Sequence, residues 1–494
     1  MEKKSKLKIA ISFPPLESKK GTPLLAQNRQ FQWFSSPTYI YPMIPASAAT
    51  LLKTNGYEVF WDDAIAEDLS YEQWKKRLIR EKPDIVAIET KTPVIKRHWK
   101  IINDLKNTKY QIPNTKYILM GDHVSALPQE SLEKSKADYV ICGGDYDFIL
   151  LNLAKKLSGK EDLKGGIWYR ENGEIKSTGI YDPAKNSLDD LPMIDRQLTR
   201  WKLYAEKNGN YKYTPGSYVM NGRDCWWGKC SFCSWTTLFP GEKFRARSVE
   251  KALDEIGELV KLGVKEIMED SGTLPVGKWL EDFCAGMIER DYNKKVVLGC
   301  NMRLNAIKDE KIWRLMKKAG FRMILFGVES ANQKTLDRIN KNLKVEEIEP
   351  ALENCKSAGL EPHVTFMLGW PWESKKDVEN TINLAKRLFK KNYIDTLQAT
   401  IAIPYPGTPL FEYCQKNNLL LTDDYDRFDQ SEPVMKSEFT ATEIKKMIRK
   451  LYRSFLTPGF LAGRMAKIKN WDDVKFVLRT AIKVLGHLAD FSSK

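Results

Sequence analysis

The chain has 494 residues, a hydrophobic content of 42% and a formal net charge of +15. This length allows two to four domains with separate cores, and no run of about 18 uncharged apolar residues predicts a transmembrane helix. The basic first residues run directly into a strand-like segment, Ile9–Phe13, without the apolar region of a signal peptide. Eight cysteines without a regular framework are typical of a reducing cytoplasm, where we expect the protein.

The positive charges are scattered among acids, and no block of five or six like charges stands out. We interpret them mainly as a lysine-rich solvated surface. An anionic substrate is the second interpretation, and we expect no nucleic-acid partner.

Residues 1–160 alternate apolar runs with helical stretches. Strands are expected at 7–13, 57–61, 84–89, 117–120 and 139–142, and helices at 46–54, 71–81, 95–106 and 129–136. This alternation predicts a doubly wound, Rossmann-like parallel sheet, which binds ligands beyond the carboxyl ends of its strands. Glycines at two of these ends allow close backbone approach to a flat or phosphorylated ligand, although turns of any parallel sheet also need glycines.

Residues 161–212 predict a linker. Asn172-Gly173 lies between two short strand-like runs and predicts a hairpin. The polar, proline-containing stretch that follows is typical of a domain boundary.

Residues 213–430 resume the alternation. Strands are expected at 217–220, 266–269, 296–301, 323–328, 364–368 and 396–403, and helices at 249–262, 276–289, 309–319, 345–358 and 375–389. Six such units predict a partial barrel, in which chemistry takes place at the carboxyl ends of the strands.

Three cysteines, Cys225, Cys230 and Cys233, directly follow the first of these strands. Clustered thiolates in a reducing compartment more often bind metal than pair as disulfides. Zinc needs a fourth nitrogen or sulfur ligand, and neither a neighbouring histidine nor a second Cys-x-x-Cys pair supplies one. Three thiolates suit an iron–sulfur cluster with one open iron; zinc, or core cysteines without a ligand, are the alternatives.

Residues 431–494 lose the alternation, and a helical segment is expected there. The stretch 441–455 predicts a basic amphipathic helix, and 471–488 predicts a second helix. Packing alone would explain the first of these.

The cysteine loop and the six units after it resemble the radical S-adenosylmethionine (SAM) superfamily. The family loop usually has three residues in its first gap, whereas Trp226–Lys229 makes four here. Phe232 occupies the aromatic position before the last cysteine, which lies near the adenine in the family. The segment Gly327-Val-Glu-Ser330 matches the family's Gly-x-Glu-Ser, whose acid lies near the cofactor.

This resemblance implies a [4Fe-4S] cluster on the three cysteines. It also implies that Phe232, Asp270, Arg303, Gly327 and Glu329 contact SAM. Three of these residues have a simpler explanation: Glu329 could cap the helix expected near Asn332, Asp270 could be a turn residue, and Arg303 could pair with an acid.

A second resemblance lies in the first domain. Tyr41–Pro45, Pro83–Ile88, Gly121–Pro128 and Val140–Gly144 are similar, in order and spacing, to the cobalamin-binding domain that precedes the barrel in many radical SAM enzymes. The residues implied to contact cobalamin are Thr92, Gly121, Ser125, Gly143 and Gly144. The family's Asp-x-His-x-x-Gly motif is absent, because Asp122 and His123 are adjacent, so we expect His123 not to ligate cobalt.

Together the resemblances imply a cobalamin-dependent radical SAM C-methyltransferase that acts on an unactivated carbon through a 5′-deoxyadenosyl radical and methylcobalamin. The substrate would be a small molecule or peptide, and a reductase or flavodoxin-type protein would donate electrons. No catalytic side chain is evident. The alternatives are cyclisation or rearrangement without methyl transfer, a first domain that binds substrate, and a non-enzymatic zinc or nucleic-acid binding protein.

Overall fold

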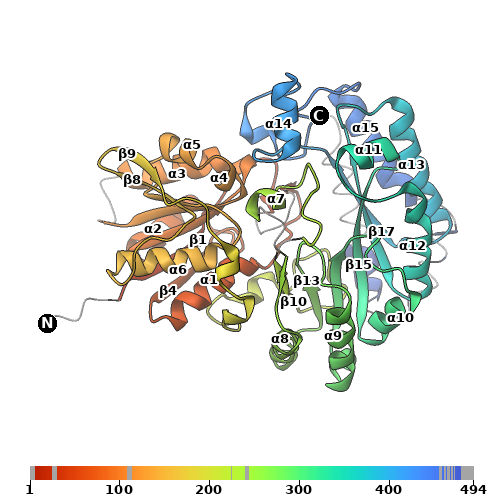
Figure 1. The fold of residues 1–494 in the computed structure, drawn as a ribbon, viewed down its shortest axis with the longest axis horizontal. Helices are drawn as coiled ribbons and strands as arrows, with labels where there is room; N and C mark the ends of the chain where they lie inside the picture. Colours follow the sequence, from red (N-terminus) through yellow and green to blue (C-terminus); the bar gives the residue numbers. More distant parts are fainter. Residues whose placement is uncertain are drawn as a thin grey trace.

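The computed structural model describes residues 6–24, 31–107, 114–223, 225–239 and 244–455, together with 459, 460, 463, 468, 471 and 473–479. Two mainly parallel sheets, each with its own helices, lie side by side in Figure 1. The predicted α/β fold class, a Rossmann-like domain followed by a partial barrel, is confirmed. Within the described part, no helix combines the length and apolar character that crossing a bilayer requires.

The first sheet has seven strands in the order β4-β1-β5-β6-β7-β8-β9. Its parallel strands are β1 (Lys8–Phe13), β4 (Glu58–Asp63), β5 (Ile85–Thr90), β6 (Lys116–Gly121) and β7 (Tyr139–Ile141). Every residue of β5 is buried, because helices cover both faces of such a sheet. A two-stranded ribbon, β2 (Thr22–Pro23) with β3 (Trp33–Phe34), was not expected from the sequence.

The helices of this domain are α1 (Met43–Thr54), α2 (Tyr71–Glu81), α3 (Ile95–Asn107), α4 (Asp122–Ala126), α5 (Pro128–Lys134) and α6 (Tyr146–Leu157). In Figure 1, α1 and α6 lie in the lower part of this domain and α3, α4 and α5 in its upper part. Helix α2 has the predicted bounds, because Ser70 and Gln73 form a reciprocal capping box at its start.

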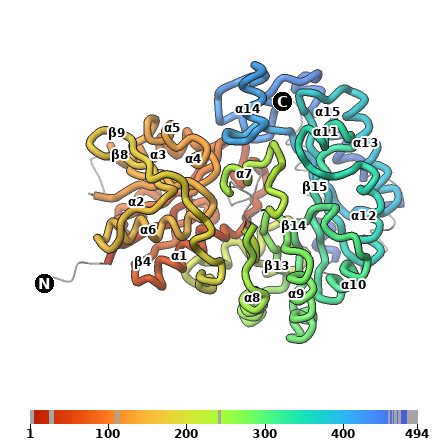
Figure 2. Tube along the Cα trace, viewed as in Figure 1, coloured from red at the N-terminus to blue at the C-terminus, as the bar shows by residue number. Residues whose placement is uncertain are grey.

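The predicted hairpin is present as β8 (Ile167–Glu171) and β9 (Glu174–Ser177), with positive φ at Asn172 and Gly173. Strand β8 pairs antiparallel with β7, so the hairpin extends the first sheet. The chain then crosses to the barrel, as the colour change from yellow to green in Figure 2 shows.

The barrel sheet has six parallel strands in chain order and does not close. They are β10 (Gly216–Val219), β13 (Glu266–Glu269), β14 (Val297–Met302), β15 (Phe321–Glu329), β16 (Glu361–Leu368) and β17 (Thr396–Ile401). The covering helices are α8 (Val249–Lys261), α9 (Lys278–Glu289), α10 (Glu310–Lys318), α12 (Val345–Ser357) and α13 (Lys375–Lys390). Short additions near the loops are β11 (Gly222–Arg223), β12 (Arg245–Ala246), α7 (Trp235–Leu238), α11 (Gln333–Arg338) and α14 (Pro409–Lys416).

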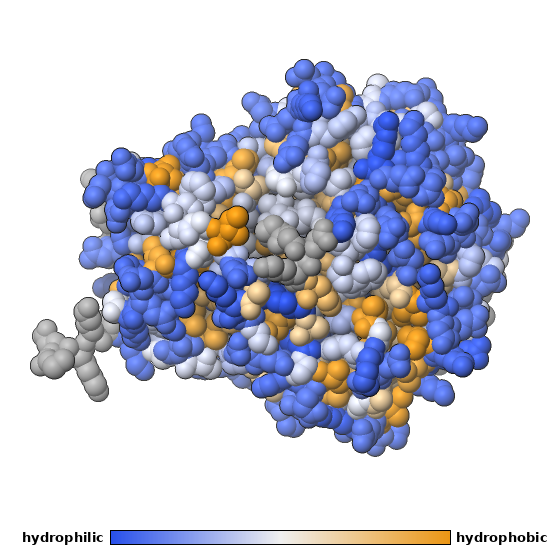
Figure 3. Space-filling model, viewed as in Figure 1, coloured by the Kyte–Doolittle hydropathy of each residue, from blue (hydrophilic) through white to orange (hydrophobic). Residues whose placement is uncertain are grey.

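The C-terminal helix α15 (Ala441–Tyr452) covers the open edge of the barrel sheet. The Tyr452 hydroxyl accepts from the Ala399 N–H at 3.2 Å and donates to its carbonyl at 3.0 Å, which satisfies edge-strand backbone groups. Of the second predicted helix, residues 471 and 473–479 are helical; the remainder lies outside the described residues. Hydrophilic residues dominate the face shown in Figure 3, and hydrophobic residues form separate groups on it.

Candidate active site

The cysteine loop follows β10 and β11, at the carboxyl end of the barrel strands. Cys225, Cys230 and Cys233 are each partly buried, and the Cys233 N–H donates to the Cys230 carbonyl at 3.2 Å. All eight cysteines lie in the described part of the chain, and none forms a disulfide. The loop therefore offers three thiols at the end of the barrel where chemistry takes place in this architecture.

Backbone contacts fix this loop to two other strand-end segments. The Ser231 N–H donates to the Ile339 carbonyl at 3.0 Å, and the Leu410 N–H donates to the Ser231 carbonyl at 2.8 Å. Within the longer first gap, the Trp227 indole donates to the Asn340 carbonyl at 2.7 Å. The four-residue gap thus allows a tryptophan to reach the segment after α11.

Gly228 makes the turn in this gap. Its φ is +60°, and a Cβ there would lie 3.2 Å from the Cys225 carbonyl oxygen. Positive φ favours glycine, so the inserted residue is accommodated by a tight turn before Cys230.

Arg303, at the end of β14, braces the same loop. Its guanidinium lies 4.9 Å from the Trp227 ring centroid and 5.4 Å from that of Trp226. Its Nη2 donates to the carbonyls of Lys341 and, at 3.1 Å, Asn342. The alternative expected for Arg303 was an ion pair with an acid, but its contacts here are tryptophan rings and backbone carbonyls. The arginine thus joins the tryptophan pair to the 341–342 turn.

Glu329, the last residue of β15, forms a buried ion pair. Its Oε1 lies 2.7 Å from the Lys341 Nζ, and its Oε2 accepts from the Thr365 hydroxyl at 3.1 Å. Glu329 has a φ of +66°, a strained conformation that often marks a functional site. Helix α11 begins after Asn332 without a side-chain cap, so Glu329 does not cap it.

Gly327 makes room for this ion pair. A Cβ at that position would lie 2.3 Å from the Glu329 Oε1 and 2.6 Å from the Lys341 Nζ. The Gly-x-Glu pattern is thereby explained sterically, whereas Lys341, in a loop twelve residues further on, carried no sequence signal.

The electrostatics of the loop depend on the same lysine. Burial raises the pKa of the Cys230 thiol, whereas the nearby Lys341 and Arg303 cations act to lower it. The Phe232 ring lies 5.9 Å from the Lys341 Nζ and packs edge-on against Trp370, 5.5 Å between centroids. The structure thus brings Cys230, Phe232, Arg303 and Glu329 together around Lys341.

Two acids end the neighbouring strand β13. Glu269 accepts from the Asn221 N–H at 2.8 Å and from Ser271, and burial raises its pKa to about 7. It thereby holds the segment just before the cysteine loop. The Asp270 N–H donates to the Val219 carbonyl at 2.8 Å, which keeps Asp270 at the strand end as predicted.

Asn221 itself was missed from the sequence. It is 1% exposed, and neither of its side-chain amide atoms has a hydrogen-bond partner among the described residues. Buried polar groups normally have partners, so this amide is suited to meet a ligand at the end of β10.

The residues predicted to contact cobalamin lie at the carboxyl ends of β5, β6 and β7. Ser125 donates to the Gly121 carbonyl at 2.7 Å and accepts from the Gly143 N–H at 2.9 Å, which ties two strand ends together. Gly121 has a φ of +124°, and a Cβ there would lie 2.2 Å from the Thr90 carbonyl oxygen.

Thr92 instead contacts His123, whose Nδ1 lies 3.2 Å from the threonine hydroxyl oxygen. The His123 ring packs against Tyr425, 4.7 Å between centroids, and its Nε2 is 3.7 Å from the Glu130 carboxylate. These contacts hold the imidazole inside the protein, in keeping with the expectation that it does not ligate cobalt.

The two predicted cofactor regions meet at α7, which follows the last cysteine of the loop. The Gly144 N–H donates to the Leu238 carbonyl at 2.7 Å, and a Cβ on Gly144 would lie 2.1 Å from the Phe239 ring. A Cβ on Gly407, after β17, would lie 2.7 Å from both Ala126 and Thr237 side chains. The absence of side chains at Gly144 and Gly407 therefore permits close contact between the two domains, next to both predicted cofactor regions.

A buried ion cluster, which we call the domain joint, lies next to this contact; it comprises Arg223, Arg245, Asp145 and Asp147. Arg223 Nη1 donates to Asp145 and Asp147 at 2.9 Å each, and its Nη2 lies 2.5 Å from the second Asp147 oxygen. Arg245 also donates to Asp145 at 2.9 Å. The joint links the start of α6 to the strand that immediately precedes the cysteine loop.

The donor set of the loop fits an iron–sulfur cluster. In the described residues no three His, Cys, Asp or Glu side chains converge as ligands of one ion. A cluster differs in that each cysteine binds a separate iron. The Lys341 and Arg303 cations act against the burial that raises the pKa of the Cys230 thiol.

A family model described as the radical SAM superfamily matches residues 222–385. An uncharacterized methyltransferase of Pyrococcus horikoshii is 30% identical over 429 residues, which cover 86% of this chain and 88% of that protein. The chain belongs to the radical SAM superfamily. An anaerobic magnesium-protoporphyrin IX monomethyl ester cyclase of Rubrivivax gelatinosus is 27% identical over 443 residues, covering 87% of this chain and 76% of that one.

The likeness of this radical SAM enzyme to a solved structure extends over both domains of this chain. The structure of the cobalamin-dependent SAM radical enzyme OxsB, with aqua-cobalamin and SAM bound, superposes with a TM-score of 0.71 at 16% identity. It covers 98% of this chain and 72% of that one. The family and the fold class predicted from the sequence are confirmed; the roles of the individual site residues remain predictions.

Proposed function

We propose that this radical SAM enzyme is a cobalamin-dependent C-methyltransferase that acts on an unactivated carbon. The observation that carries the proposal is the convergence on α7. The strand ends that we predict to hold cobalamin and the loop that we predict to hold the cluster both contact this one helical turn, through Gly144 and Cys233. A substrate between the domains would reach both cofactors.

Each predicted site has residues that suit its cofactor. Cys225, Cys230 and Cys233 would hold a [4Fe-4S] cluster, which with SAM supplies a 5′-deoxyadenosyl radical. Glu329 and Lys341 offer opposite charges to the charged groups of SAM, and the Trp226–Trp227 pair would keep water from the cluster.

The first domain suits a large planar ligand. Gly143 is partly exposed at the end of β7, Gly121 is buried at the end of β6, and Ser125 and Thr92 lie beside them as polar side chains. His123 is engaged within the domain, so we propose a corrinoid without a histidine on its lower face.

The printed names of the relatives favour methyl transfer but leave a second candidate. The Pyrococcus protein is named a methyltransferase and the Rubrivivax protein a cyclase. Cyclisation without methyl transfer is therefore the alternative for this chain. Either reaction needs a low-potential electron donor, for which we propose a reductase or flavodoxin-type protein. The eight cysteines, none of them in a disulfide, are suited to a reducing cytoplasm.

The test begins with anaerobic reconstitution using iron, sulfide and hydroxocobalamin, followed by metal analysis. We expect about four irons and about one cobalt per chain. Incubation with SAM and a low-potential reductant should then yield S-adenosylhomocysteine in a cobalamin-dependent manner, because methyl transfer consumes one SAM in this way.

The outcomes separate the candidates. Formation of 5′-deoxyadenosine alone, with cobalt bound, would favour the cyclase. Iron without cobalt would leave the radical chemistry and reassign the first domain to substrate. Zinc without iron would refute the proposal.

A further inference from the structure

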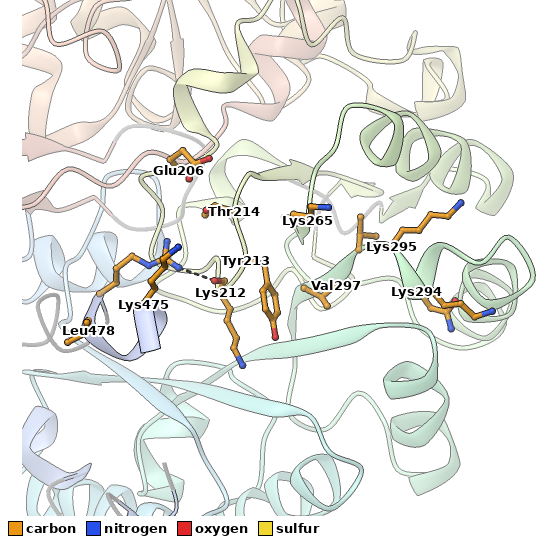
Figure 4. A pocket seen from close by; sticks show the side chains of 13 residues that line it. Glu206, Lys212, Tyr213, Thr214, Lys265, Lys294, Lys295, Val297, Lys475 and Leu478 are labelled. Carbon is orange, nitrogen blue, oxygen red and sulfur yellow. Dashed lines mark hydrogen bonds between the residues drawn. The ribbon is translucent and has the colours of Figure 1, made fainter. Parts of the chain in front are cut away.

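A cavity of about 770 Å³ opens at the end of the barrel opposite the cysteine loop (Figure 4). Its walls are the segments that lead into β10, β13 and β14, together with residues 475–479 of the C-terminal segment. The cavity is therefore separate from both predicted cofactor sites, which lie at the carboxyl ends of the strands.

Positive charge is concentrated in this cavity. The six cations among its thirteen lining residues are Lys212, Lys265, Lys294, Lys295, Lys475 and Arg479. Glu206 is the one acid among those described lining residues, which leaves a net charge of +5. The whole chain has a net charge of +15, so a small part of the molecule holds about a third of its net charge.

Some of these cations already have acidic neighbours. The Lys212 Nζ lies 2.6 Å from Asp473, and the Lys294 Nζ lies 2.6 Å from Asp291. No acidic oxygen of the described residues lies within 4.0 Å of the charged nitrogens of Lys265 or Lys475. These two lysines, on opposite walls, can direct their charge to a ligand.

The wall from the C-terminal segment is firmly attached to the barrel. Phe476 is 8% exposed and lies 5.7 Å from the Arg322 guanidinium. The Arg479 Nη2 donates to the Lys212 carbonyl at 2.9 Å. The cavity is thus built by tertiary packing, with cations contributed by distant parts of the sequence.

We propose that this cavity binds a phosphorylated small molecule that carries at least two phosphates. Lysines serve as point charges for phosphate, and the volume lies within the range of small-molecule sites. The Tyr213 ring, Val297 and Leu478 give it an apolar wall for the remainder of such a ligand. Nucleic acid or an acidic protein would need an extended charged surface, whereas these cations line one cavity of limited volume.

The test is calorimetric titration of the reconstituted full-length holoenzyme with inorganic triphosphate at 150 mM salt, roughly physiological. Lys265→Gln/Lys475→Gln removes two cations from the cavity. Lys386→Gln/Lys390→Gln removes two exposed cations from α13 and is the matched control. We expect the cavity variant to lose at least about tenfold in affinity, since a charged hydrogen bond contributes roughly that factor, while the control binds like the parent protein.

Three results would overturn the proposal. The parent protein could fail to bind triphosphate at this salt concentration. Both variants could weaken equally, as non-specific charge attraction would require. A polynucleotide or an acidic peptide could compete more tightly than triphosphate in the parent protein but not in the cavity variant. Unchanged iron content in both variants would separate each result from damage to the active site.

Discussion

The domain joint predicts a large effect from one substitution, Arg223→Met. Side chains of Arg223, Asp145 and Asp147 are 4%, 1% and 0% exposed. Burial acts to raise the pKa of Asp145, but Arg223 and Arg245 outweigh it and hold that pKa below its ordinary value. After the substitution, Arg245 would still neutralise Asp145, whereas Asp147 would lose the cation that contacts both of its oxygens.

The expected cost follows from one buried charge left without its partner. Such a loss is about 3–5 kcal/mol. Because the urea slope of a chain this long is about 3 kcal/mol per M or larger, the midpoint of urea unfolding would fall by at most about 1.7 M. The control is Arg387→Met on α13. Arg387 forms an ion pair with Glu349, and its side chain is 50% exposed. Pairs of that kind contribute less than about 1 kcal/mol.

Anaerobic urea unfolding, followed by tryptophan fluorescence, measures both variants. Adding Asp147→Asn to Arg223→Met should recover part of the loss, because it removes the stranded charge. A midpoint shift for Arg223→Met no larger than that of Arg387→Met would refute the conclusion that the joint is a desolvated charge cluster. So would a double variant less stable than Arg223→Met alone.

The remaining predictions concern the two cofactor regions and pH. Cys230→Ala should abolish 5′-deoxyadenosine formation, measured by chromatography, and leave corrinoid binding intact. Gly144→Ala places a Cβ 2.1 Å from the Phe239 ring; we expect a loss of about 1–3 kcal/mol and a lower cobalt content. Burial raises the pKa of Glu89 to about 7, so its protonated form favours the fold, and stability should fall as pH rises from about 4.5 to about 7. Glu89→Gln keeps an acceptor for the Tyr146 hydroxyl and should remove most of this slope, about 3 kcal/mol, in thermal unfolding at several pH values.

Each of these has its own check. Cys355→Ala, a buried cysteine outside the loop, should retain iron; retained deoxyadenosine in Cys230→Ala would remove that residue as a ligand. Phe239→Leu should restore cobalt to Gly144→Ala, and a failure to do so would mean that the glycine matters for another reason. An unchanged pH slope in Glu89→Gln would assign that slope to a different group.

Much of the fold followed from local patterns. The period of apolar residues predicted β13 (Glu266–Glu269) and α2 with their observed bounds. The two-residue turn at Asn172-Gly173 predicted its hairpin, because that dipeptide tolerates positive φ. Short elements such as α4 were missed, since five residues contain too little periodicity to detect.

Only part of the candidate site could be predicted from the sequence. Cysteine spacing and Gly327-Val-Glu-Ser330 indicated the family. Lys341 and Asn221 could not be found, because a lone polar residue in a loop acquires its meaning from tertiary contacts. Arg303 was singled out from the sequence, but its contacts with the Trp226 and Trp227 rings could not be predicted, because they depend on the fold of a different loop.

The short segment from Cys233 to Phe239 has a consequence for handling the protein. It begins at a predicted cluster ligand, Cys233, and ends against the first domain, so loss of iron from the predicted cluster would release one end of a segment that connects the two domains. Exposure to air should therefore do more than inactivate the enzyme. We expect oxidised preparations to become sensitive to protease between the domains.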